Sequence, residues 1–396
     1  MQTPTPRPAR VRNSQLILKT IYGNGPLSRA DLARETSLTP PTVSDVVASL
    51  IESGLVEEVG LAPSSSGRRP ILLRVVDGSR QLIGIDLSRE DFRGALVNLR
   101  GQIGYRKDLP LEGRDGDAAL ALVYDLVDVL VERATNPVLG IGIGAPGLVD
   151  AANGVLQQSV NLNWRYIPFA KLLRKRYNLP VYMANDSQAG ALAIYIFSQL
   201  PKKGLPLVLI ELGWGVGAGI IVNGQLLHGS PVGAGEIGHI TINPDGDQCA
   251  CGNYGCLETI ASSRSIIKRV RMLAKNNPKS AITNLVSDPE QIDMDTISLA
   301  LETGNEDVHQ VIKEAGEALG IAASNLIGVL GSCQILIHGS VARFGQLLLD
   351  PMREVMDQRT LPSLARGSEI GIASIESDIV IQGASALILQ NELGVL

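Results

Sequence analysis

The chain has no long hydrophobic run, few cysteines and no excess of positive charge. None of its apolar stretches reaches the roughly 18 residues that a membrane-spanning helix needs, and its proline-rich start does not fit a signal peptide. We therefore expect a cytoplasmic protein with no membrane partner. Disulfides are rare in that compartment, so the four cysteines need another explanation. The net charge of −5 argues against nucleic-acid binding over the whole surface.

Charge is unevenly distributed along the 396 residues. Residues 1–75 contain nine Lys and Arg against six Asp and Glu, a net charge of +3 that leaves −8 for the rest. A basic N-terminal module on an acidic body suggests DNA contact at one end only. The length predicts two or three domains, and 45% hydrophobic with 19% charged residues indicates a globular chain.

The stretch 236–258 gathers three of the four cysteines within eight residues, and a histidine lies ten residues before the first of them. Three thiolates and one imidazole from a single loop are typical of a closed tetrahedral zinc site of the structural kind. Gly252 and Gly255 between the cysteines let the backbone turn sharply. The alternative is a cluster of buried thiols without metal. The predicted zinc ligands are His239, Cys249, Cys251 and Cys256, whereas Cys333 lies in an apolar segment and is expected in the core.

The first 76 residues predict a winged helix-turn-helix. Residues 1–12 look like a flexible basic arm, and Asn13 is a plausible N-cap for a helix that ends near residue 22. Ser28 and Asp31 predict a capping-box start for a second helix. A third helix, opened by two prolines, shows one apolar face and ends at Gly54. Residues 55–60 and 71–76 then form a hairpin.

In that module the third helix would enter the major groove, while the hairpin tip would reach phosphates or the minor groove. Asp45 is awkward near phosphates, so it either accepts from a cytosine amino group or turns away. The alternative is a three-helix packing module that does not bind DNA. The candidate DNA-contacting residues are Pro40, Thr42, Ser44, Asp45, Arg68 and Arg69.

Behind this module the sequence predicts two similar β-rich halves, each starting with three consecutive strands and continuing with helices and further strands. Such a repeat indicates an α/β fold with an actin-like, ribonuclease-H-like duplication, in which ligands bind in the cleft between the halves. We place the DNA-binding domain at residues 1–76 and the first lobe at 80–199, completed by a C-terminal helix at 382–396. The second lobe, with the zinc loop, covers 200–381.

The zinc loop resembles that of the ROK family, which unites sugar kinases with sugar-responsive transcriptional repressors, and the resemblance covers essentially the whole chain. It implies a zinc cofactor and a sugar or sugar-derivative effector. His239 would serve both ligands, one ring nitrogen binding metal while the other N–H faces the sugar. The segment 161–164 resembles the family's segment beside the sugar. The residues expected to face the sugar are Gly147, Asn185, Asp186, Glu236, His239 and Glu258.

Asp186 matches the general base of the family's kinases, which takes the proton from the attacking sugar hydroxyl. It falls where a strand meets a helix N-terminus, and the helix dipole would hold its carboxylate ionised. Asn-Asp before a helix is also an ordinary N-cap, and residues 144–147 could be an ordinary strand-ending turn.

The two nucleotide loops depart from the kinase pattern. The kinases end their first strand in D-x-G-G-T, whereas residues 86–91 read D-L-S-R-E-D and bring Glu90 and Asp91 near the phosphate position. The second loop, 212–219, keeps its glycines but carries Trp214 where the kinases have a small hydroxyl residue. We therefore expect a non-enzymatic repressor that binds operator DNA as a homodimer or tetramer. The alternatives are an active sugar kinase with an added DNA-binding domain, and a docking protein whose helix-turn-helix contacts only protein.

Overall fold

The computed structural model describes residues 6–61, 69–198, 200, 204–229, 232–277, 281–373 and 378–395. They form two compact units, Met1–Ala189 with Asp378–Leu396, and Gly190–Ser377. The chain passes between the units inside helix α6 (Asp186–Phe197) and again just before helix α13 (Ile379–Ile388). Within the described ranges no helix is both long and apolar enough to cross a membrane.

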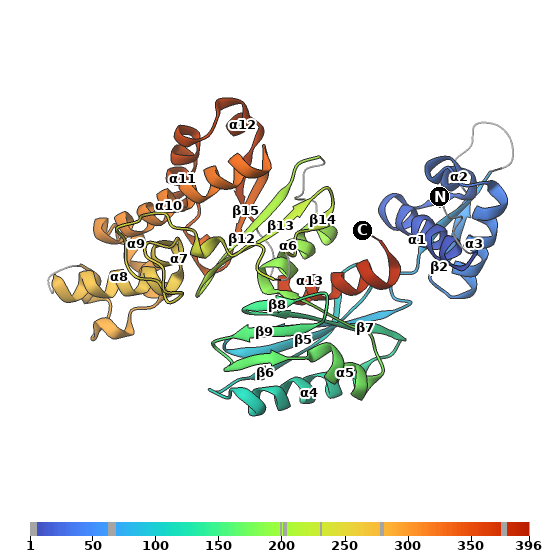
Figure 1. Cartoon of the computed structure of the whole chain (residues 1–396), viewed down its shortest axis with the longest axis horizontal. Helices are drawn as coiled ribbons and strands as arrows, with labels where there is room; N and C mark the ends of the chain where they lie inside the picture. The colour runs from blue at the N-terminus through green and yellow to red at the C-terminus, as the bar shows by residue number, and fades with distance from the viewer. Residues whose placement is uncertain are drawn as a thin grey trace. The chain divides into compact units, whose positions relative to one another are not determined.

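The N-terminal part of the first unit is a winged helix-turn-helix (Figure 1). Its helices are α1 (Pro6–Asn24), α2 (Arg29–Thr36) and α3 (Pro40–Glu52), and its strands are β1 (Leu27–Ser28), β2 (Val56–Leu61) and β3 (Ile71–Val75) in the order β1-β3-β2. The predicted capping box is present, because Ser28 Oγ accepts from the Asp31 N–H at 3.2 Å and the Ser28 N–H donates to Asp31 Oδ2 at 3.1 Å. The apolar face of α3 is buried as predicted.

The start of this module differs from the prediction. Residues 6–12 are not a flexible arm, because α1 already begins at Pro6 and Asn13 lies inside the helix. A proline is favoured at a helix start, where its missing N–H would have no partner, so a proline-rich stretch can open a helix as well as prevent one. The two-residue strand β1 is also new, and it joins the start of α2 to the hairpin.

Behind this module the first unit contains a five-stranded sheet of order β11-β7-β4-β5-β6. The first three strands in sequence are antiparallel, while β7 and β11 run parallel to β4. The bounds are β4 Gln81–Leu87, β5 Asp91–Val97, β6 Ile103–Pro110, β7 Val138–Ala145 and β11 Val181–Asn185. A small second sheet, unforeseen in the sequence, consists of β8 Leu148–Asp150, β9 Val155–Ser159 and β10 Trp164–Ile167.

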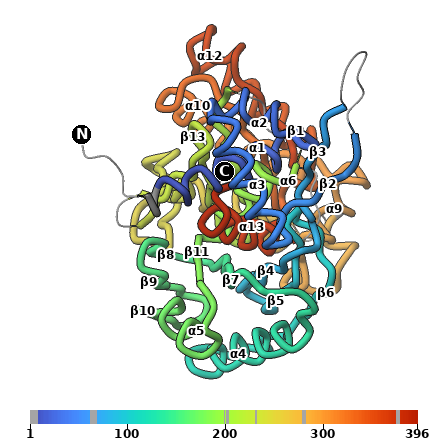
Figure 2. Tube along the Cα trace, turned by 90° about the vertical axis from the view of Figure 1, so that its right-hand side faces the viewer, coloured from blue at the N-terminus to red at the C-terminus, as the bar shows by residue number. Residues whose placement is uncertain are grey.

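Helix α4 (Gly116–Arg133) packs against β5 and β6, while α13 packs on β4, β7 and β11 (Figure 2). The contact with α13 is close because the strands present glycines to it. A Cβ at Gly142 would lie 1.8 Å from the Ala384 carbonyl oxygen, and one at Gly84 would lie 2.3 Å from that of Ile381. Helix α5 (Phe169–Tyr177) precedes β11, and a π-helical turn, Leu389–Leu393, follows α13. The unit is thus completed by residues distant in sequence.

The second unit repeats this topology with a sheet of order β14-β13-β12-β15-β16. Its strands are β12 Leu207–Leu212, β13 Val216–Val222, β14 Gln225–Leu226, β15 Gln334–His338 and β16 Glu369–Ile372, and again three antiparallel strands are followed by parallel ones. Its α-helices are α7 Glu258–Ala261, α8 Ser263–Asn276, α9 Met294–Glu302, α10 Glu306–Leu330, α11 Gln346–Arg359 and α12 Pro362–Gly367. The short 3-10 helices are η1 Ile237–His239, η2 Ala281–Asn284, η3 Pro289–Gln291 and η4 Ser340–Phe344.

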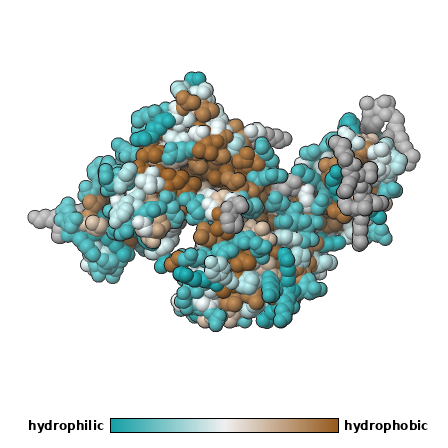
Figure 3. Space-filling model, in the orientation of Figure 1, coloured by the Kyte–Doolittle hydropathy of each residue, from teal (hydrophilic) through white to brown (hydrophobic). Residues whose placement is uncertain are grey.

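The repeated strand order confirms the predicted duplicated α/β body. The core of the second unit is mainly aliphatic and includes Cys333, which is fully buried as expected. In the space-filling view, apolar residues gather over the sheet of this unit with hydrophilic residues around them (Figure 3).

Candidate functional site

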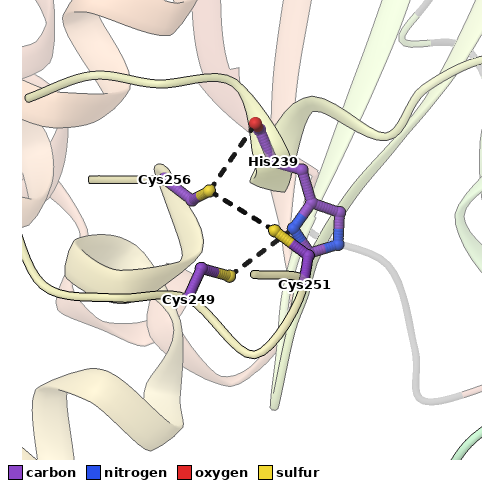
Figure 4. Close-up of side chains that lie close together, drawn as sticks. All are labelled: His239, Cys249, Cys251 and Cys256. Atoms are coloured by element: carbon purple, nitrogen blue, oxygen red, sulfur yellow. Dashed lines mark hydrogen bonds between the residues drawn. The ribbon is translucent and has the colours of Figure 1, made fainter. Parts of the chain in front are cut away.

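The four predicted zinc ligands lie together in the second unit (Figure 4). Their possible ligand atoms are all within 4.8 Å of one another. Cys249 Sγ lies 3.7 Å from His239 Nδ1, and Cys251 Sγ lies 3.7 Å from Cys256 Sγ. A tetrahedral ion at the usual Zn–S length of about 2.3 Å requires sulfur atoms about 3.8 Å apart. The arrangement therefore fits a closed zinc site with three thiolates and one imidazole.

Backbone geometry brings these ligands together. The zinc loop, residues 239–256, folds back on itself through the Cys249 N–H bond to the Asn253 carbonyl (2.7 Å) and the Gly255 N–H bond to the Asp247 carbonyl (2.9 Å). Gly255 has φ of +63°, and a Cβ there would lie 1.5 Å from the Asn243 carbonyl oxygen. Only glycine fits this position, which explains why a glycine directly precedes the last cysteine.

The electrostatics of the cluster suit a cation. Burial raises the pKa of Cys256 to about 12, so a thiolate at this position needs a positive charge beside it. The N–H of Asn253 lowers the pKa of Cys251. His239 turns Nδ1 toward the sulfur atoms, and Figure 4 shows its other ring nitrogen on the far side of the ring. That second nitrogen therefore lies away from the sulfur atoms (Figure 4).

Strand β13 positions the three predicted sugar-facing residues of this unit. The Ala218 N–H donates to the Gly235 carbonyl at 2.8 Å, which holds the backbone next to Glu236 against the strand. Glu258 begins α7, and its Oε2 accepts from the Val216 N–H of the same strand at 3.2 Å. His239 closes the short helix η1 between them. The structure thus brings Glu236, His239 and Glu258 to one strand.

The remaining predicted sugar-facing residues lie together in the first unit, where β7 and β11 end side by side. Asn185 Nδ2 donates to the Gly147 carbonyl at 3.1 Å. Gly147 has φ of +99°, and a Cβ there would lie 2.2 Å from the Gln158 carbonyl oxygen. Asp186 is the first residue of α6, and its Oδ1 accepts from the Ser187 N–H at 2.8 Å.

Two opposing effects act on the Asp186 carboxyl. Burial raises its pKa, whereas the Ser187 N–H at the start of α6 lowers it, so the predicted effect of the helix N-terminus is present but is not the largest one. That this carboxyl is ionised stays a prediction. In the segment 161–164, which stays a predicted neighbour of the sugar, Asn161 and Asn163 are exposed, whereas Trp164 is buried in the core between Phe92 and Phe169. The Trp164 Nε1 donates to the Gly116 carbonyl at 2.8 Å, so its polar atom is used inside the unit.

Side chains of the loop at residues 86–91 bond to one another and to Arg93. Ser88 Oγ donates to the Asp91 carbonyl at 2.5 Å, and Arg93 pairs with Asp86 at 2.8 Å and with Asp91 at 3.4 Å. Burial raises the pKa of Asp86 to about 7, although Arg93 opposes the shift. Sequence reasoning missed Arg93, whose signal was its position two residues after Asp91, on the same face of β5.

The predicted DNA-contacting residues are only partly gathered on one surface. Pro40, Ser44 and Asp45 are exposed on α3, whereas Thr42 is half-buried and its hydroxyl bonds that of Thr39 at 2.9 Å. Arg69 is exposed at the start of the returning hairpin segment. Arg68 lies outside the described residues.

Comparison with known proteins places the chain in a family. Residues 82–391 match the ROK family, and residues 12–57 match a winged helix-turn-helix DNA-binding module. A xylose repressor from Caldicellulosiruptor bescii is 33% identical over 96% of both chains. A solved structure, described as a ROK family transcriptional regulator homologous to the E. coli MLC protein, superposes with a TM-score of 0.87 at 29% identity over 98% of both chains. A glucokinase from Halalkalibacterium halodurans is 31% identical over 79% of this chain and 96% of its own.

The chain therefore belongs to the ROK family, as its zinc loop predicted. Within that family it carries a DNA-binding winged helix-turn-helix in front of the body. The two regulators match it over nearly its full length, whereas the glucokinase matches about four-fifths of it.

Proposed function

We propose that this protein is a sugar-responsive transcriptional regulator that binds operator DNA and represses genes of carbohydrate metabolism. The observation that carries the proposal is the combination of a DNA-binding winged helix-turn-helix with a ROK body, matched over nearly the full length by a xylose repressor. An effector sugar bound by the body would change the operator affinity of the module.

In this proposal α3 is the recognition helix. Its exposed Ser44 and Asp45 have short side chains that suit close approach to base edges, and Arg69 follows the hairpin tip, where a positive charge would meet a phosphate. Arg68 would act in the same way. Operators of such proteins usually contain paired half-sites, which favours a homodimer as the DNA-binding species.

Effector recognition is assigned to two sets of residues. Gly147, Asn185 and Asp186 supply a carbonyl, an amide and a carboxyl in the first unit, and Glu236, His239 and Glu258 supply two carboxylates and an imidazole in the second. A sugar needs many such partners, because each mismatched hydroxyl leaves a buried polar group unpaired. Zinc, held by His239, Cys249, Cys251 and Cys256, would fix the loop between Glu236 and Glu258.

The bonded side chains of the first loop support a role without phosphate transfer. Phosphate groups of ATP need backbone N–H groups and cations, whereas this turn presents Asp91 held by Ser88 and Arg93. At about 4 Å, each contact between like charges costs on the order of 1–4 kcal/mol. In the second loop Trp214 is 44% exposed, and its bulk stands where a kinase needs a small hydroxyl residue.

A second candidate is an active sugar kinase with an added DNA-binding module. It is favoured by Asp186, whose raised pKa suits a general base, and by the 31% identity to a glucokinase. It requires nucleotide binding at the two altered loops. A third candidate, a docking protein, requires a helix-turn-helix that does not bind DNA.

One variant separates the first two candidates. Asp186→Asn keeps the size of the side chain but removes its charge, so effector binding should weaken by about 10- to 150-fold, the equivalent of about 1.5–3 kcal/mol for a charged hydrogen bond. Operator binding without sugar should stay unchanged. Sugars are screened by thermal shift, where a ligand at 100 times its Kd adds about 2.7 kcal/mol.

The parent protein should show no sugar-dependent ATP turnover. Turnover on any tested sugar that Asp186→Asn abolishes would establish the kinase and end the regulator proposal. A gel shift on genomic fragments over a range of salt concentrations tests the docking alternative, because specific DNA binding must weaken steeply with salt.

A further inference from the structure

The carboxylate of Glu258 is held on three sides within the second unit. Its Oε2 accepts from the Val216 N–H at 3.2 Å, and its Oε1 accepts from the Arg264 guanidinium at 3.1 Å. On the third side Gly215 approaches closely, since a Cβ there would lie 2.8 Å from Oε2. The side chain is only 14% exposed. A carboxylate fixed in this way has lost the freedom that a surface glutamate normally keeps.

Two of the three groups around Glu258, Val216 and Gly215, belong to the second glycine loop, residues 212–219. The Gly213 carbonyl accepts from both the N–H and the hydroxyl of Ser263 at 2.9 Å, and the Gly213 N–H donates to the Gly215 carbonyl at 3.1 Å. Residues 258–264 therefore close over the loop. The Val216 N–H, which a phosphate could otherwise use, is bonded to a negative side chain instead.

We propose that the second glycine loop serves as a receptor for the Glu258 carboxylate, and that Arg264 is the positioning residue that sets sugar affinity through it. The inference rests on the proposed function, because it takes Glu258 as a sugar-facing residue. A carboxylate offers about four lone-pair directions, and Val216 and Arg264 use one on each oxygen. Each oxygen then retains one acceptor direction, which suits a ligand with two neighbouring hydroxyl groups.

Arg264 acts through Glu258 and not as a stabilising ion pair. Its side chain is 41% exposed, and ion pairs of this exposure contribute little to folding stability. The same helix provides a matched control. Lys268, one turn further along α8, pairs with Asp247 of the zinc loop at 3.4 Å and is 65% exposed, but the two residues leave Glu258 untouched. The Arg264–Glu258 pair thus includes the sugar-facing carboxylate, and the Lys268–Asp247 pair does not.

The test uses the full chain with zinc bound and measures sugar affinity by calorimetry, with the tightest sugar of the thermal-shift panel and its monodeoxy analogues. Arg264→Met should weaken sugar binding about tenfold, Arg264→Lys should recover part of that loss, and Lys268→Met should bind within about twofold of the parent. Gly215→Ala should also weaken binding, because its methyl group displaces Oε2. Zinc content and sugar-free operator binding should be the same in all four variants.

The deoxy analogues provide a readout that general instability would not change. If Arg264 orients Glu258 toward particular hydroxyls, removing one of them from the sugar weakens binding to the parent. The same removal should weaken binding to Arg264→Met several-fold less. Two outcomes would overturn the inference and leave the proposed function standing. One is that Arg264→Met binds sugar as tightly as the parent, and the other is that Lys268→Met loses as much affinity as Arg264→Met. A parent protein that binds no sugar would overturn both.

Discussion

Tyr22, at the C-terminal end of α1, joins the DNA-binding module to the body of the first unit. Its hydroxyl donates to the Leu99 carbonyl at 2.6 Å, in the turn between β5 and β6. Arg100 of the same turn donates to the Tyr22 carbonyl at 2.8 Å and stacks on its ring at 4.1 Å, while its Nε pairs with Asp77 at 2.9 Å. Burial raises the pKa of Tyr22 to about 12, so its hydroxyl remains a donor at neutral pH.

Tyr22→Phe removes that donor and keeps the ring. The Leu99 carbonyl then loses its partner, and an unsatisfied buried acceptor costs about 1–3 kcal/mol. We expect the module to separate from the turn about 5- to 150-fold more often, because 1.4 kcal/mol changes an equilibrium constant tenfold. The ring still stacks under Arg100, so the loss should stay below that of Arg100→Met, which removes the bond to the Tyr22 carbonyl, the stacking and the ion pair together.

Native-state hydrogen exchange measures this opening, since amides in the last turn of α1 lose protection when Tyr22 and Arg100 no longer hold that turn. A double-mutant cycle of Tyr22→Phe with Arg100→Met should give a coupling of about 0.5–3 kcal/mol, as for residues in contact. The control is Tyr105→Phe, which makes the same chemical change at a tyrosine that also lies under an arginine, Arg133 at 5.7 Å. Unchanged exchange in Tyr22→Phe, or an equal effect in Tyr105→Phe, would show that Tyr22 does not hold the module.

Three further outcomes are expected. Purified protein should contain about one zinc per chain by elemental analysis, and Cys251→Ser should lose it together with effector binding. Replacing Arg68 and Arg69 by alanine should weaken operator binding and reduce the salt slope by about one to two units. Because the folded-state pKa of Asp86 is raised to about 7, its contribution to stability is complete below about pH 4 and is lost as the pH rises toward 7. Urea unfolding over this range should show that decline, and Asp86→Asn should remove it.

Each of these has a control and a contradicting outcome. Cys333→Ser lies in the core outside the cluster and should keep the metal, while normal effector binding by metal-free protein would falsify the zinc assignment. The control for the arginine variant is Arg74→Ala, which should leave the salt slope nearly unchanged because the Arg74 guanidinium already pairs with Glu57. If the variant without Arg68 and Arg69 binds operator like the parent at every salt concentration, the hairpin tip does not contact DNA. For Asp86, the free energy of unfolding of the parent is compared with that of Asp86→Asn. If the parent gains stability relative to this variant between pH 4 and 7, the direction given for the pKa shift of Asp86 is wrong.

The zinc loop was predictable because its ligands are close in sequence and their spacing is itself the signal. Most strands of the two five-stranded sheets were predictable for a similar reason, since they are apolar or alternating runs between turns, whereas the short strands β8, β9 and β10 were not. Contacts that depend on how elements are placed in space were not. The bond between Arg264 and Glu258 joins residues only six apart but depends on the angle between α7 and α8, and that between Tyr22 and Leu99 spans 77 residues. Local signals also misled, as prolines that suggested an arm in fact open α1.

The position of α13 in the chain has a consequence for biosynthesis. Gly84 and Gly142 let the backbone of α13 pack closely on one face of the first sheet, yet the whole second unit, Gly190–Ser377, is translated before that helix. At about 5–20 residues per second, the nascent sheet waits on the order of 10–40 s for its cover. During that time its apolar strands are exposed to chaperones or to neighbouring chains on the same messenger. A prematurely terminated chain that lacks α13 cannot complete the body to which its DNA-binding module is attached, so translation errors should be removed by proteolysis before they can compete for operators.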